Sequence, residues 1–94
     1  MSVDVTRIAA LPKLEFAVEV RDERGSSRHA VTADPALVAR LAGGRRISDE
    51  RFVEAVFEFL LEREPKDAIL SRFDVSVVSR YFPEFERVIG TYLP

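Results

Sequence analysis

The sequence contains no cysteine, no tryptophan and only one histidine. Without cysteine, the chain can form neither a disulfide framework nor a thiolate metal site. A single histidine leaves only carboxylates as further metal ligands, and none of them stands at the spacing of a His-Glu-x-x-His site. We therefore expect no metal and no cofactor, and a fold that is stabilised by packing alone in a reducing compartment.

Long hydrophobic runs are missing as well. Uninterrupted apolar stretches reach only three or four residues, far short of the length that crosses a bilayer. Residues 1–11 include Asp4 and only scattered apolar positions, which is unlike a signal peptide. These features predict a cytoplasmic protein with no membrane contact.

The composition is that of a small globular protein. Of the 94 residues, 47% are hydrophobic and 32% are charged. We see no repeat and no linker, so we predict a single domain over residues 1–94. The net charge of −2 argues against a general affinity for nucleic acid. The charge is uneven, because residues 1–47 carry +2 and residues 48–94 carry −4.

Alternation with period two predicts strands near the N-terminus. Residues 14–21 alternate apolar and polar side chains and give the strongest strand signal. A turn containing Gly25 follows, and residues 27–32 are typical of the returning strand of a hairpin. Residues 3–8 alternate less regularly and can add a third strand. The prediction is a two- or three-stranded antiparallel hairpin or meander over residues 1–33.

Residues 34–94 are predicted to form four or five helices packed on these strands. Asp34 is an N-cap and Gly43 a C-terminal stop for the first helix. Ser48 caps the longest helix, in which apolar residues recur at helical spacing. Strands followed by helices, rather than alternating with them, indicate an α+β fold. The expected helices after the first one cover residues 48–64, 66–72, 75–81 and 84–92.

Catalysis has little support in the sequence. His29 would need a nucleophile and an orienting partner close by. Ser26 and Ser27 are near it in sequence, but they lie in a turn or along the next strand, without the Gly-x-Ser-x-Gly context of a hydrolase elbow. The carboxylates fall in turns or on the polar sides of helices. We predict that the protein is not an enzyme.

Arginine could serve an anion or nucleic-acid site at two places. Gly43 and Gly44 precede two arginines and the helix that begins at Ser48, and free amides at a helix N-terminus can hold phosphate. A flexible connector with solvated side chains is the simpler interpretation, because a Walker motif follows a strand and this segment follows a helix. If the fold gathers them, four residues would form one patch: Arg24, Arg28, Arg45 and Arg46.

Residues 66–81 resemble a helix-turn-helix in outline. A first helix would carry Ala68 and Ile69, and a second would present Ser79 and Arg80 to a DNA groove. The segment departs from the usual motif at Asp74, where glycine is favoured. It also lies in the acidic half of the chain, whereas phosphate contacts need lysine and arginine. Binding of DNA or RNA is therefore the alternative hypothesis, and ordinary helix packing is the simpler one.

Aromatic residues are concentrated in the C-terminal half, where the last 43 residues hold eight of the nine. Most must build the core, because aromatic side chains bury the largest areas. The helix over residues 48–64 has an apolar arc so wide that it is either central to the fold or also faces a partner. The leading hypothesis is a non-enzymatic protein that acts by protein–protein contact, with homodimerisation as one form of that contact. The candidate interface residues are Phe52, Phe59, Tyr81, Phe82 and Phe85.

Three blocks in the C-terminal third carry a resemblance to a known group of sequences. They are Phe-Leu-Leu-Glu-Arg-Glu-Pro at 59–65, Ile-Leu-Ser-Arg-Phe-Asp at 69–74 and Ser-Arg-Tyr-Phe-Pro-Glu-Phe at 79–85. The sequence resembles small hypothetical proteins of bacterial genomes in these blocks. The resemblance implies a bacterial origin and carries no activity, ligand or catalytic residue.

Overall fold

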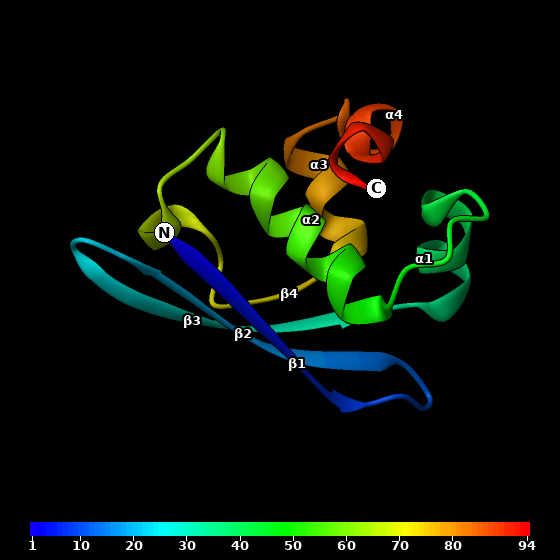
Figure 1. Cartoon of the computed structure of the whole chain (residues 1–94), viewed down its shortest axis with the longest axis horizontal. Coiled ribbons are helices and arrows are strands. Elements are labelled where there is room, and N and C mark those ends of the chain that lie inside the picture. Colours follow the sequence, from blue (N-terminus) through cyan, green and yellow to red (C-terminus); the bar gives the residue numbers. More distant parts are fainter.

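The computed structural model describes all 94 residues as a four-stranded sheet with helices packed on one of its faces (Figure 1). This confirms the α+β class. The strands are β1 (Ser2–Ala9), β2 (Leu14–Asp22), β3 (Gly25–Ala33) and β4 (Arg72–Asp74). The helices are α1 (Pro35–Ala42), α2 (Asp49–Leu61), α3 (Val78–Tyr81) and α4 (Phe85–Val88), with 3-10 turns at Lys66–Ala68, Val75–Val77 and Ile89–Tyr92.

The sheet order is β1-β2-β3-β4, so β1 and β4 form its edges. The first three strands are an antiparallel meander, which confirms the third strand near the N-terminus. Phe16 and Val18 of β2 are buried, as the alternation predicts, whereas Glu15 and Ala17 are exposed on the opposite face. The helices therefore cover one face of the sheet and leave the other in solvent (Figure 1).

Strand β4 corrects the prediction that residues 34–94 are purely helical. The helix expected over residues 66–72 is only the 3-10 turn Lys66–Ala68, after which the chain extends and pairs in parallel with β3. The amide of Ala30 donates to the carbonyl of Ser71 at 2.8 Å, and Phe73 is buried opposite Val31. A helix of seven residues is marginal by itself, so pairing with the sheet prevails here.

The helix caps predicted from the sequence are formed. The amide of Ala36 donates to the Asp34 carboxylate at 2.8 Å, and Gly43 ends α1 with a φ of 63°, a conformation that glycine adopts without strain. The amide of Arg51 donates to Ser48 Oγ at 3.0 Å at the start of α2. The two C-terminal helical segments, residues 75–81 and 85–92, lie where the sequence predicts them, but each is one α-helical turn joined to a 3-10 turn.

Helix α2 crosses the sheet and is the centre of the core (Figure 1). Its residues Phe52, Phe57 and Phe59 are fully buried between the sheet and the C-terminal helices. The buried hydrophobic side chains form one cluster of 22 residues, drawn from the sheet and from the helices. None of the helices combines the length and the apolarity needed to cross a bilayer.

Candidate functional site

The five aromatic residues predicted for a partner interface divide into two groups. Phe52, Phe59 and Phe85 are buried in the core, so a partner of the folded chain cannot reach them. Tyr81 is 66% exposed and Phe82 is half-buried. The apolar arc of α2 is wide because this helix is central: the sheet covers one side of it and the C-terminal helices cover another.

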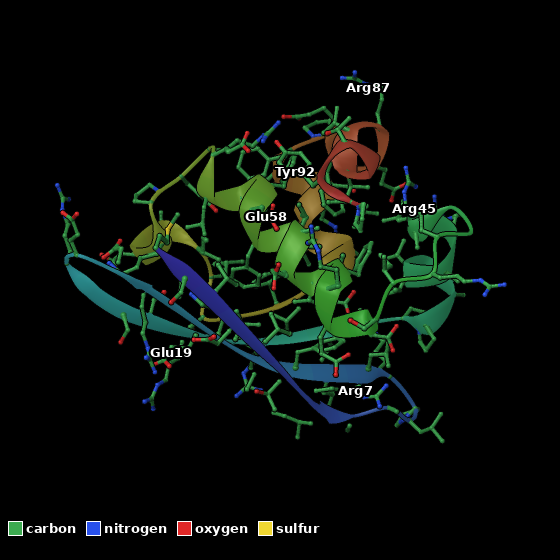
Figure 2. All side chains as sticks on the ribbon, viewed as in Figure 1. Arg7, Glu19, Arg45, Glu58, Arg87 and Tyr92 are labelled. Atoms are coloured by element: carbon green, nitrogen blue, oxygen red, sulfur yellow. The ribbon has the colours of Figure 1, made fainter.

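The four arginines of the predicted patch do not gather at one place. Arg24 and Arg28 lie at the β2–β3 hairpin, whereas Arg45 and the adjacent Arg46 follow α1 at the opposite end of the long axis (Figures 1 and 2). The Arg45 guanidinium donates to the carbonyls of Ala42 and Pro94 at 3.0 and 3.2 Å. It therefore ties the end of α1 to the C-terminal residues of the chain.

The helix-turn-helix outline over residues 66–81 is wrong as a description of the backbone. Strand β4 lies where the first helix would end, and α3 has only four residues. In the motif, a first helix crosses the DNA backbone and supports the second helix in the major groove. Here no first helix is formed, and α3 with the 3-10 turn before it gives only seven helical residues, followed at once by Phe82 and Pro83.

Ser27 and His29 form a hydrogen-bonded pair with the spacing of a nucleophile and its base. Ser27 Oγ is 2.8 Å from His29 Nε2, and His29 Nδ1 is 2.7 Å from the carbonyl oxygen of Leu70. A carbonyl oxygen only accepts, so His29 Nδ1 donates to Leu70; in the tautomer that carries its one proton on Nδ1, Nε2 accepts from the serine hydroxyl. The ring is buried against Phe57, and neither Ser27 nor His29 lines any of the five main cavities. The pair joins β3 to the segment that leads into β4.

One surface cavity has a volume of about 290 Å³, and nine of its ten lining residues are hydrophobic. It lies between the C-terminal end of α2, the segment around Leu70 and helix α3. Its wall includes the buried side chains of Leu60 and Phe73, while Leu70 and Tyr81 are 48% and 66% exposed. The volume lies at the lower end of the range of ligand sites and suits one large apolar side chain.

Glu64 is the only charged residue that lines this cavity. Burial raises the pKa of its carboxyl group above the usual value, and no cation acts on it in the opposite direction. The next lysine in the chain, Lys66, is almost completely buried and pairs instead with Asp22 at 3.0 Å. Glu64 and Leu70 cannot be recognised as site residues from the sequence, because the cavity forms only when the segment before β4 folds beside α3.

We expect Glu64→Gln to raise the free energy of unfolding at pH 7. A carboxyl group whose pKa is higher in the folded state than in the unfolded state opposes folding above the folded pKa and not below the unfolded pKa. The variant should therefore gain stability at neutral pH and lose this gain as the pH falls through the carboxyl range. Urea unfolding at pH 7 and pH 3 measures both, and an equal gain at the two pH values would contradict the prediction.

No three acidic or histidine side chains gather closely enough to hold a metal ion. Comparison of the chain with protein-family models, curated proteins and solved structures finds no match. The candidate site therefore rests on geometry: the apolar cavity, its two exposed rim residues Leu70 and Tyr81, and the carboxylate of Glu64.

Proposed function

We propose that this chain is a non-enzymatic protein of the bacterial cytoplasm that acts by binding another protein at the apolar cavity. The observation that carries the proposal is the position of Leu70 and Tyr81. They are two of the five exposed large apolar side chains, and both line the same cavity. Exposed apolar side chains that surround a hollow are characteristic of contact surfaces. Phe82 of the predicted interface lines this cavity too.

A protein partner fits this cavity better than a small molecule does. A small-molecule site is usually a well-formed cavity that encloses roughly 70–90% of the ligand surface. Here, a compound that fills the hollow would still leave much of Tyr81 and Leu70 in water. A protein surface that inserts one side chain would cover the rim as well, and exclusion of water around such an anchor is what makes it contribute to affinity.

The hypothesis has one narrower form, homodimerisation, and one alternative, the binding of nucleic acid. Homodimerisation is the case in which the partner is a second copy, and it predicts a concentration-dependent mass in sedimentation equilibrium. Binding of DNA or RNA has less support, because Arg24 and Arg28 lie far from Arg45 and the chain carries a net charge of −2. Titration with nucleic acid at several salt concentrations tests this alternative, and binding that weakens steeply as salt is added would support it.

The proposal is tested by replacing one rim leucine and, as a control, one leucine elsewhere. N-acetyl-leucine amide serves as the probe, and methyl chemical shifts report where it binds. Saturable shifts are expected at Ile69 and Leu70, and Leu70→Ser should weaken binding by about tenfold, the value of one lost apolar contact. Leu11→Ser removes an 84% exposed leucine outside the cavity and should leave binding unchanged. Equal effects of the two variants, or no saturable shifts, would refute the proposal.

A further inference from the structure

The cavity combines an apolar lining with one carboxylate that has no partner within the chain. We infer that it selects a protein segment in which a large apolar side chain stands next to an arginine or lysine, with the apolar group in the cavity and the cation on Glu64. The inference rests on the proposed function, because it specifies the partner of the same surface.

The backbone holds Glu64 at the edge of the cavity. Its amide donates to the carbonyl of Leu60 at 2.9 Å, so the residue continues the last turn of α2. Pro65 follows and fixes its own φ angle, which restricts the backbone on the other side of Glu64 as well. The backbone at Glu64 is therefore fixed before a partner arrives, so binding orders only the side chain, which lowers the entropy cost of using the carboxylate.

The two cations nearest to Glu64 in sequence are both paired with other acids. The Arg63 Nε atom lies 3.1 Å from Glu84, and its guanidinium also donates to the carbonyl of Phe59. Lys66 is 3.0 Å from Asp22. Neither of them neutralises Glu64, which agrees with a pKa raised by burial alone. Because Arg63 and Lys66 both pair with other carboxylates, the Glu64 carboxylate is available to bind a cation of a partner protein.

The apolar lining and the carboxylate would have different effects on binding. Burial of the anchor provides most of the affinity, because it removes apolar surface from water. The carboxylate provides selectivity, since an acidic neighbour of the anchor would meet a like charge in a partly dehydrated site. An uncharged neighbour would leave Glu64 partly covered and unpaired, which costs free energy. The expected order of affinity is therefore cationic, then neutral, then acidic.

Three blocked dipeptides with the same anchor test this order: N-acetyl-Leu-Arg amide, N-acetyl-Leu-Gln amide and N-acetyl-Leu-Glu amide. At low salt, the unaltered protein should bind the arginine peptide about three- to fivefold more tightly than the glutamine peptide, as for a partly exposed ion pair. The difference should shrink as salt is added. Glu64→Gln should abolish this difference, and the glutamine peptide should bind at least as tightly as before, because no unpaired charge is then covered.

Glu62→Gln is the matched control. It removes the same charge two residues away, and Glu62 does not line the cavity. Its hydrogen bond from the Tyr92 hydroxyl, 2.9 Å long, can be kept by the glutamine oxygen. Preference for arginine should survive in this variant. If the preference for the arginine peptide were lost equally in Glu62→Gln and Glu64→Gln, it would come from net charge, and the inference would be overturned.

Equal affinities of the unaltered protein for all three peptides would overturn the inference and leave the proposed function standing. Failure of all three peptides to bind would refute both.

Discussion

Replacing Phe59 with alanine is expected to lower the free energy of unfolding by about 3–5 kcal/mol, the usual cost of truncating a buried phenylalanine. The ring is fully buried at the middle of the C-terminal aromatic cluster. Its centroid lies 5.1 Å from that of Phe85 and 5.8 Å from those of Phe82 and Tyr92, all in edge-on contact. The Arg63 guanidinium lies 3.7 Å from the same centroid. The substitution therefore removes the centre around which α4 and the C-terminal residues pack on α2.

Urea unfolding of the monomer measures this cost and distinguishes the two interpretations of Phe59. A core residue gives the large loss just stated, whereas a residue that serves an interface would give little. Tyr81→Ala is the control: its 66% exposed ring should change the free energy of unfolding by no more than about 0.5 kcal/mol. A loss below about 1 kcal/mol for Phe59→Ala would contradict the burial of this ring.

The parts of the fold that the sequence predicts correctly are those determined by local chemistry. The alternation of β2 places Phe16 and Val18 in the core, because consecutive side chains of a strand point to opposite faces. The side chains of Asp34 and Ser48 accept hydrogen bonds from amides two and three residues later, so both caps are readable from a short segment. These signals need no knowledge of the rest of the chain.

The parts that could not be predicted depend on contacts between distant segments. Strand β4 has only three residues and pairs with β3, which comes from the other half of the chain. Lys66 looks like an exposed residue at the start of a helix, yet its ammonium group is buried on Asp22, at the end of β2. Tyr81 of the candidate site could be suspected as an interface aromatic. Glu64 could not, because its isolation from cations is a property of the folded chain.

Asp74 holds the end of β4 in place through a set of hydrogen bonds. Its carboxylate accepts from Thr32 Oγ1 at 2.6 Å, from Lys13 Nζ at 3.0 Å and from the hydroxyl of Ser76 at 2.7 Å. Burial by itself would raise the pKa of Asp74, but the hydrogen bonds from Thr32, Ser76 and Lys13 together outweigh it and lower the pKa to about 2. One carboxylate thus connects β4 to β3 and to the β1–β2 turn.

Asp74→Asn is expected to lower the free energy of unfolding by about 2 kcal/mol at pH 7. The substitution removes the charge of the carboxylate, and with it the stabilisation that corresponds to a pKa lowered from 3.8 to about 2. A carboxyl group with a lowered folded-state pKa stabilises the fold above its unfolded pKa, and this stabilisation disappears as the pH falls through the folded value. The difference in the free energy of unfolding between the variant and the unaltered protein should therefore be constant above about pH 5 and shrink between pH 4 and pH 2.

Asp67→Asn, with a 77% exposed side chain, serves as the control and should change the free energy of unfolding little. Urea unfolding across this pH range measures the effect, and a difference that stayed constant down to pH 2 would show that the hydrogen bonds of Asp74 do not depend on its charge.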